Sequence, residues 1–345
     1  MFIQPEICVI SDLHFGIHQN SPLWHATALK FTDWLVDQLK ACGIHDIIIA
    51  GDVFHNRCDI AVNTLNVVAQ IFNKLSEFNI KVIVGNHDAF YKDRSDVNSI
   101  DILGGWKNIT VYKDVAVIDY MGSKLAFCPW GTTIDQIPNA DIVFGHFEIA
   151  SFKMNNFKVC DHGFIAEDLF KKTNMVITGH FHLKEERLYK NGTIIYLGSP
   201  VELDWGDKNT TKGIYLLDLL TKKYRFVENT ISPKHVEVKL TNLIKNGLAT
   251  IKDDVKGNIV RFIVDKELET DKIDLIAKKI SGYQPIAFDI EHFCFSQTDQ
   301  TSDVQQTDSG VDITQTIHEF VNAMDIKEKE KVYSYIIELY NKTNQ

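Results

Sequence analysis

The sequence has few of the residues that build a disulfide-stapled or cysteine-zinc fold. Its 345 residues include six cysteines, and no two of them form a C-x-x-C pair. This sparse use excludes a disulfide framework and a cysteine-based zinc site, and it is typical of a reducing cytoplasm. No apolar run reaches the roughly 20 residues of a membrane span, and no basic leader precedes the short apolar run at 7–10. We therefore predict a cytoplasmic protein without a membrane segment.

Positive charge is also scarce. The chain has 36 Lys and Arg residues against 46 Asp and Glu residues, a formal net charge of −10. This balance excludes binding of nucleic acid by overall electrostatics alone, so a phosphate-rich substrate would need bound cations or a local basic patch. Hydrophobic residues make up 45% and charged residues 24% of the chain. These ordinary proportions exclude collagen-like and wholly disordered chains.

Several short runs share one local pattern, in which apolar residues are followed by a small residue and then by a residue able to bind a metal. They lie at 7–12, 47–52, 82–86, 142–146 and 175–180. Uninterrupted β-branched runs of this kind suit strands buried on both faces. Amphipathic stretches at 24–42 and 60–78 separate the first three runs and predict crossover helices. Strands and helices in this order predict a parallel sheet whose polar strand ends meet at one edge.

Further strands are predicted downstream, as antiparallel additions and a second sheet. Strand-like pieces lie within 109–127 and at 193–197, 213–217 and 224–227. Together with the first runs they predict a layered α/β/β/α sandwich over residues 1–233. Beyond Pro233, a small α+β capping domain is predicted at 234–295. Its strands are expected near 236–240, 259–264 and 286–293, around a helix near 271–280.

The C-terminal part differs in composition. Residues 296–312 hold two apolar side chains and four aspartates without Lys or Arg, which predicts an acidic flexible linker. Within 313–345, apolar spacing predicts two helices, at 313–323 and 326–340. Such a helical pair has too little core of its own, so its apolar face either binds a partner or folds back on its own domain.

Polar side chains stand at the ends of the predicted strands. Residues two apart on an extended segment point to the same side, which pairs Asp12 with His14 and His180 with His182. Taken alone, the patterns at 12–14, 51–52 and 145–146 are more typical of a cap, a turn or a loop, whereas 85–88 and above all 179–182 favour a metal site. Their order after successive buried strands strengthens this prediction. The predicted metal ligands are Asp12, His14, Asp52, Asn86, His146, His180 and His182.

The number of ligands favours two ions. If Asp52 bridges them, each ion keeps open positions for water and substrate. Two divalent cations bring a charge that exceeds that of the two carboxylates, which suits an anionic phosphate. Imidazoles mixed with oxygen ligands favour manganese, iron or zinc over magnesium or calcium. The ligand sets would be Asp12, His14, Asp52 and His182 for one ion, and Asp52, Asn86, His146 and His180 for the other.

Two further histidines are candidate catalytic residues. His87 directly follows Asn86 and is not needed as a ligand, so we predict that it is the general acid that protonates the leaving oxygen. Asp88 would orient it. His55 would contact the scissile phosphate or assist this proton transfer, and the alternative is an ordinary loop histidine. His162 is interpreted as a loop residue outside the site.

These motifs carry a resemblance to a known family. They are Asp12-x-His14, Gly51-Asp52, Gly85-Asn86-His87-Asp88, Gly145-His146 and Gly179-His180-x-His182. Together they resemble the signature of the calcineurin-like metallophosphoesterases. Further motifs are Asp52-Val53-Phe54-His55, Cys128-Pro129-Trp130, Gly198-Ser199-Pro200, Leu203-Asp204-Trp205-Gly206 and Lys212-Gly213. These resemble the SbcD-type nuclease subunits of double-strand-break repair complexes, and the paired C-terminal helices resemble the bacteriophage recombination endonuclease subunits of this family.

The resemblance implies a function and partners. It implies a Mn²⁺-dependent hydrolase, a 3′–5′ exonuclease and single-strand endonuclease acting on DNA in recombination, replication and repair. It also implies a homodimer formed through the early helices, and an SbcC-type coiled-coil ATPase bound to the C-terminal helices. A phage-encoded member would work in the host cytoplasm. Two alternatives stay open at this point: a two-metal phosphoesterase acting on small molecules or phosphoproteins, and a binding scaffold whose site has decayed.

Overall fold

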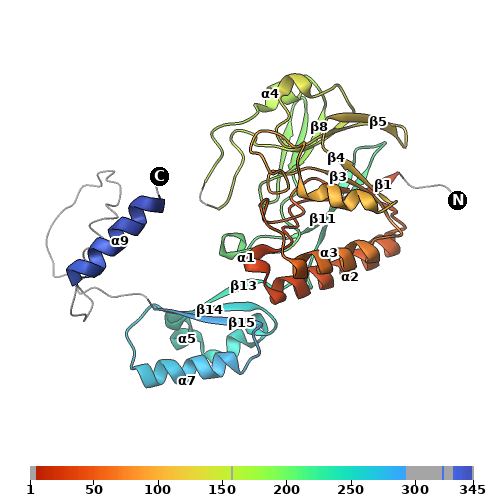
Figure 1. The fold of residues 1–345 in the computed structure, drawn as a ribbon. Helices are drawn as coiled ribbons and strands as arrows, with labels where there is room; N and C mark the ends of the chain where they lie inside the picture. Colours follow the sequence, from red (N-terminus) through yellow and green to blue (C-terminus); the bar gives the residue numbers. More distant parts are fainter. Residues whose placement is uncertain (1–4, 157, 293–320, 322–328, 344–345) are drawn as a thin grey trace. The chain divides into compact units, whose positions relative to one another are not determined.

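The computed structural model describes residues 5–156, 158–292, 321 and 329–343. The chain divides into two units, residues 1–293 and 294–345, and each is described by itself. In the described part of the first unit the strands form three sheets, of six, six and three strands (Figure 1).

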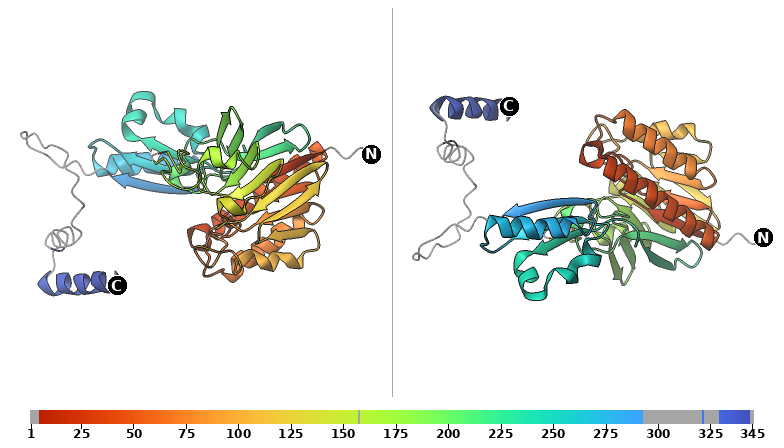
Figure 2. Two further views of the ribbon diagram at one scale, coloured as in Figure 1. Left: turned by 90° about the horizontal axis from the view of Figure 1, so that it is seen from above. Right: turned by 90° about the horizontal axis from the view of Figure 1, so that it is seen from below.

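The first sheet contains the three N-terminal strands with polar ends. Its strands lie in the order β12 (Tyr224–Glu228), β11 (Gly213–Asp218), β1 (Glu6–Ile10), β2 (Asp46–Ile49), β3 (Asn79–Ile83) and β4 (Ile109–Tyr112). Strands β1 to β4 are parallel, whereas β11 and β12 are antiparallel additions. The crossover helices are α2 (Pro22–Cys42) and α3 (Val62–Lys74), which run side by side along the molecule (Figures 1 and 2). The predicted strand–helix alternation is therefore confirmed.

The second sheet contains the other two strands with polar ends. Its order is β5 (Ala116–Tyr120), β6 (Ser123–Cys128), β7 (Ile142–His146), β8 (Met175–Gly179), β10 (Gly192–Tyr196) and β9 (Glu185–Tyr189). Strands β6, β7, β8 and β10 are parallel. The short segments α4 (Ala166–Leu169) and η2 (Ile134–Gln136) pack against this sheet. Three other short segments, α1 (Ile17–Asn20), η1 (Ser99–Gly105) and η3 (Trp205–Asp207), pack against the core of the first sheet.

Alternating side chains explain the layers. On β1, Cys8 and Ile10 pack with the apolar face of α2 and α3, whereas Ile7 and Val9 face the second sheet. The face of the second sheet that is turned away from the first has its own core, built with α4 and the loop around Phe152. Both sheets are therefore buried on both faces, which is why their central strands read as unbroken apolar runs. The predicted layered metallophosphoesterase-type α/β/β/α architecture is confirmed.

Two details of the sequence prediction were wrong. The polar-ended strands do not belong to one sheet, because β7 and β8 lie in the second sheet and only β1, β2 and β3 in the first. The piece at 109–112 is also no antiparallel addition, since β4 pairs in parallel with β3. A short apolar run does not encode which neighbour it pairs with, and long-range packing decides this.

The third sheet lies beyond residue 233. Its strands β13 (His235–Lys239), β14 (Ile259–Val264) and β15 (Ala287–His292) are all parallel. They alternate with α5 (Leu240–Asn246), η4 (Leu248–Ile251), α6 (Lys252–Val255) and α7 (Thr270–Ser281), and have a core of their own. The strands and the helix near 271–280 are as predicted, although the strict alternation is of α/β rather than α+β type. The domain limits themselves stay a prediction.

In the second unit, α9 spans Lys329–Thr343, close to the second predicted C-terminal helix. The predicted linker at 296–312 and the predicted helix at 313–323 lie outside the described residues, apart from position 321. Within the described ranges, no helix combines the length and the apolar character that crossing a membrane requires.

Candidate active site

All the predicted ligands converge on one place, although they come from two sheets. Asp12 and His14 follow β1, Asp52 follows β2 and Asn86 follows β3. From the second sheet, His146 ends β7 and the pair at 180 and 182 follows β8. Backbone bonds join the loops, since the Asp12 N–H donates to Gly51 O (3.1 Å) and the His14 N–H to Asp52 O (3.0 Å). The carboxyl ends of the strands thus form one rim.

Four of these residues have a backbone conformation that side chains rarely adopt. The φ angles are 55° for Asp12, 46° for His14, 54° for Asp52 and 93° for His180. Left-handed conformations at non-glycine residues are strained, and they persist only where the surrounding structure holds them. Strain concentrated on the candidate ligands is typical of a functional site rather than of ordinary turns.

The glycines before the ligands allow the strand ends to approach closely. A Cβ atom on Gly51 would lie 2.4 Å from His146 Nδ1, and one on Gly85 would lie 2.2 Å from Asp52 Oδ1. A Cβ atom on Gly179 would lie 1.9 Å from Ser11 Oγ. A side chain at Gly51 or Gly179 would push the two sheets apart at the rim, and one at Gly85 would separate the loops after β2 and β3.

The first ligand group consists of Asp12, His14 and His182, whose ligand atoms lie within 4.8 Å of one another. His14 Nε2 is 3.0 Å from His182 Nε2 and 4.0 Å from Asp12 Oδ1. Asp12 and His14 are buried. Two imidazole nitrogens and a carboxylate directed at one point form a donor set that fits a divalent cation.

The second ligand group consists of Asp52, His146 and His180, also within 4.8 Å. Asn86 Oδ1 completes it, at 2.9 Å from His146 Nε2 and 2.8 Å from His180 Nδ1. Asp52 Oδ2 lies 3.3 Å from His146 Nε2 and 3.6 Å from His14 Nε2, so one carboxylate oxygen faces both groups. This is the geometry that a bridging ligand requires.

Burial and mutual charge perturb the pKa values of the candidate ligands. Burial lowers the pKa of His14, His180 and His182, which favours the neutral imidazoles that bind metals. Burial raises the pKa of Asp12 to about 7. Burial raises the pKa of Asp52, but the charges of His146 and His14 and a hydrogen bond from His146 together outweigh this effect. The pKa of Asp52 is therefore lowered, and this carboxyl stays ionised. The burial of the site and Asp52 act in opposite directions on the pKa of His146, and the carboxylate raises this pKa to about 9. Buried carboxylates beside imidazoles form a donor set that divalent metal ions fit.

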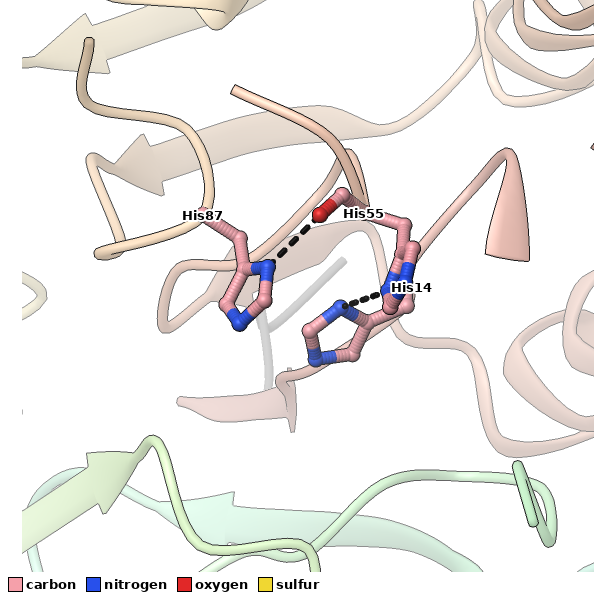
Figure 3. A group of neighbouring side chains, drawn as sticks. All are labelled: His14, His55 and His87. Carbon is pink, nitrogen blue, oxygen red and sulfur yellow. Dashed lines mark hydrogen bonds between the residues drawn. The ribbon is translucent and has the colours of Figure 1, made fainter. Parts of the chain in front are cut away.

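His87 and His55 lie beside the first ligand group (Figure 3). The backbone N–H of His87 donates to Asp52 Oδ1 (2.8 Å), and His87 Nδ1 of the ring lies 2.6 Å from the His55 carbonyl oxygen. Because a carbonyl only accepts, Nδ1 of His87 carries its proton, and Nε2 is left for proton transfer. His55 Nδ1 is 3.3 Å from His14 Nδ1, so His55 also holds a candidate ligand in place.

Asp88 does not orient His87, contrary to the sequence prediction. Its buried carboxylate accepts the backbone N–H groups of Val53, Phe54 and Gly85, at 3.2, 2.9 and 3.0 Å. Burial raises its pKa to about 6. Asp88 therefore joins the loops after β2 and β3, while a main-chain carbonyl orients His87. Adjacency in sequence suggested the wrong partner because the two side chains diverge at a tight turn.

Glu148 is a contact of the site that sequence reasoning missed. Its Oε1 lies 3.4 Å from His180 Nε2, while His180 Nδ1 faces Asn86. A carboxylate on the second ring nitrogen fixes the tautomer of a metal-binding histidine. Glu148 also lies 3.4 Å from His162, the histidine that was placed outside the site. Its position two residues after His146 is the one local signal that could have indicated it.

Lys212 supports the other end of the His180-x-His182 motif. Its buried ammonium donates to the His182 carbonyl (2.7 Å), to Ser199 Oγ (2.8 Å) and to Asp207 Oδ1 (2.7 Å). Asp207 in turn accepts the Leu203 N–H (2.8 Å). The motifs at 198–213 therefore form one hydrogen-bonded network beneath His182.

A two-sheet sandwich with paired ligand groups at its strand ends is the architecture of a metal-dependent phosphoesterase. The chain belongs to the calcineurin-like phosphoesterase superfamily, whose domain model matches residues 6–221. The predicted family is therefore confirmed, and the chain is a metal-dependent hydrolase. The groups around Asp12 and Asp52 are its candidate metal-binding residues.

Individual relatives agree with the predicted SbcD-type branch. Exonuclease subunit 1 of Enterobacteria phage T4 is 24% identical over 361 residues, covering 99% of this chain and all of the relative. The DNA double-strand break repair protein Mre11 of Nanoarchaeum equitans (strain Kin4-M) is 23% identical over 314 residues, covering 80% of this chain and 81% of that protein. A solved structure, a dimetal phosphatase from Danio rerio, is 11% identical over 65% of this chain and 95% of its own, with a TM-score of 0.41.

Proposed function

We propose that this protein is a DNA nuclease with two divalent metal ions, a 3′–5′ exonuclease and single-strand endonuclease that works in double-strand-break processing and recombination. One observation carries the proposal: Asp52 Oδ2 faces both ligand groups while Asp52 Oδ1 accepts the backbone N–H of His87. The bridging position and the candidate acid are thereby held by one carboxylate. The length over which the chain aligns with the phage exonuclease subunit supports DNA as the substrate.

The metal ions supply the charge that the chain lacks. When bound, two divalent ions lower the pKa of a water that attacks phosphorus and stabilise the charge on the phosphoryl oxygens. We propose manganese, because four imidazoles with oxygen donors suit a borderline transition metal better than magnesium or calcium. The proposed ligands of the two ions are Asp12, His14, Asp52, Asn86, His146, His180 and His182.

The proton transfers fall to the histidines of the chain. His87 holds its Nδ1 proton on the His55 carbonyl, so a protonated Nε2 gives its proton to the leaving oxygen as the phosphodiester bond breaks. His55 contacts His14 through Nδ1 and stacks on His87, with ring centroids 5.4 Å apart. In this proposal His55 positions both rings and contacts the scissile phosphate.

Partners follow from the resemblance and from the surface. We include a homodimer in the proposal, because α3 exposes apolar Val62 (82% exposed) and Leu65 (36%). The domain at 234–295 would cap the DNA. The helical segment 313–345, which includes α9, would bind an SbcC-type ATPase, and the linker at 296–312 would tether it. The apolar face of such a segment needs a partner. A phage-encoded protein of this kind would act in the host cytoplasm.

The deciding experiment combines metal analysis with a nuclease assay. The full chain loaded with Mn²⁺ should bind two ions and degrade single-stranded DNA from the 3′ end. A phosphoserine peptide and p-nitrophenyl phosphate serve as controls for the other substrate classes. Hydrolysis of those controls without cleavage of DNA would contradict the proposal.

Deletion of residues 313–345 should keep basal cleavage while complex formation with the ATPase is lost.

A further inference from the structure

A cavity beside the second ligand group is not used by the chemistry described above. Its volume is about 380 Å³, within the range of about 300–1,000 Å³ that small-molecule sites occupy. Residues that line it include Trp130, Ile134, His146, Phe147, Glu148 and Phe164. It therefore shares a wall with the candidate ligand His146, and with Glu148, which holds His180.

Trp130 forms a fixed aromatic wall of this cavity. Its indole N–H donates to the Lys92 carbonyl (2.7 Å), and its backbone N–H donates to the Val84 carbonyl (2.9 Å). The ring centroid lies 5.1 Å from that of His180 and 6.1 Å from that of His146. A ring held at both its main chain and its indole nitrogen is oriented before any ligand binds.

The chemistry of the cavity suits a flat, uncharged group. Phe147 and Phe164 pack edge to face, with centroids 5.0 Å apart, and add aromatic surface. Among the described residues that line the cavity, Lys92 is the only lysine or arginine, and it is exposed. Glu148 contributes a carboxylate. Glu148 offsets the charge of Lys92, so these walls offer no net positive charge to a second phosphate, whereas a nucleobase can stack on them regardless of its identity.

The contacts also indicate which base of the strand would enter. The candidate acid His87 has ring contacts with His14 and His55, on the side of the first ligand group. Trp130 contacts the histidines of the second group. The leaving oxygen is thus expected toward His87, and the nucleotide that keeps the phosphate toward Trp130.

We propose that this cavity is a nucleobase subsite, in which the base of the nucleotide that keeps the phosphate stacks on Trp130 beside His146 and His180. The proposal rests on the proposed nuclease function. It assigns Trp130 to substrate positioning and makes recognition independent of base identity, because every base offers a face for stacking. Stacking of one base corresponds to about 5- to 150-fold in affinity.

The test removes each stacking partner in turn. Single-stranded oligonucleotides with either a normal 3′-terminal nucleotide or an abasic one are compared on the manganese-loaded full chain and on Trp130→Ala. Removal of the base should raise the KM of the wild type about 5- to 150-fold, and Trp130→Ala should raise it equally for normal DNA. Combining both changes should cost no more than either alone. Independent, multiplying effects would overturn the proposal.

Controls separate this proposal from the nuclease function and from misfolding. Trp106→Ala, which removes a tryptophan that packs near Phe72, should leave the abasic effect unchanged. Trp130→Phe should recover most of the affinity, and all variants should retain two bound ions. A wild type that cleaves normal and abasic DNA equally well would refute the subsite alone, whereas one that cleaves neither would refute the nuclease.

A second readout does not depend on any change at Trp130. With the manganese-loaded His87→Asn protein, 2-aminopurine at the 3′ end of the oligonucleotide should lose fluorescence on binding because it stacks. The same probe several nucleotides upstream should change less. Equal signals at the two positions would contradict the subsite, even if Trp130→Ala failed to fold.

Discussion

The first and the third sheets are built alike but end differently. Both have parallel strands over a buried apolar core, joined by helices. After β1 and β2 the chain turns through buried Asp12 and Asp52 with positive φ angles. After β14 the chain continues through Asp265, which is partly exposed and accepts the N–H of Thr241 (2.9 Å). Neither Leu240 after β13 nor Asp265 has a positive φ.

This contrast shows that parallel strand ends alone do not make a site. The first sheet faces the second across a shared core, so its strand ends meet others and bury their polar side chains. The third sheet has no second sheet against it among the described strands. Buried carboxylates need compensating charge, which a metal can supply, whereas a carboxylate near solvent can cap a neighbouring helix.

The largest effect is expected from matched aspartates in the two sheets. Asp52→Ala should remove the oxygen that faces both ligand groups, reduce bound metal to less than two ions and lower phosphodiesterase activity at least about 10³-fold. Asp265→Ala should keep both ions and cost only about 1 kcal/mol of stability. Metal analysis, kinetics and urea unfolding of the two variants provide the comparison. Equal metal content in both would refute the bridging assignment.

Next in size is the effect expected of His87, the proposed general acid. His87→Asn should lower kcat by about 10²- to 10⁴-fold while two ions remain bound, because the proton donor is lost and the ligands are kept. The measurement pairs metal content with steady-state kinetics. Loss of an ion in this variant would show that His87 is a ligand instead of the acid.

Two glycines sharpen the comparison further. Gly179→Ala places a Cβ atom 1.9 Å from Ser11 Oγ. This change should lower the free energy of unfolding by about 3 kcal/mol, and it should also weaken metal binding. Gly257 precedes β14 by two residues, has a φ of 73°, and a Cβ atom there meets nothing within 4 Å. Gly257→Ala should cost about 1 kcal/mol, the penalty of a left-handed alanine. If both variants lost the same free energy of unfolding, the close approach of the two sheets at Gly179 would not be required for stability.

The smallest effect is expected at Glu148. Glu148→Gln keeps the shape but weakens the hold on His180, and should reduce metal affinity by about 10- to 100-fold with both sites still able to fill. Titration calorimetry with Mn²⁺ measures this change. The matched variant Glu167→Gln lies on α4, away from the ligand groups, and should bind manganese like the wild type.

The candidate ligands were predictable because each follows a local rule. An apolar strand, a small residue and a metal-binding residue in succession place that side chain at a strand end, and this pattern identified Asp12, Asp52, Asn86 and His180 with their neighbours. Their assembly in space agrees with the prediction. The pattern could not show that β7 and β8 lie in a second sheet. The same succession of residues occurs at a strand end whether the strands belong to one sheet or to two.

The supporting contacts were not predictable because they join positions far apart in the chain. Lys212 meets the His182 carbonyl 30 residues away. Trp130 meets His180. Such contacts depend on how the loops pack, and no periodicity records them. For Asp88 the sequence suggested a contact that the structure does not have. Asp88 is next to His87 in sequence, but its carboxylate accepts backbone N–H groups of residues more than 30 positions earlier.

Each ligand group combines donors from the two halves of the sandwich. Asp12 and His14 of the first sheet meet His182 of the second, and Asp52 meets His146 and His180. A cation in either group would therefore cross-link the two layers as well as prepare the chemistry. Its binding energy would appear as added resistance to unfolding, which grows with the logarithm of free metal concentration. Chelation should accordingly loosen the seam between the layers first, and amide exchange along β1 and β7 would report it.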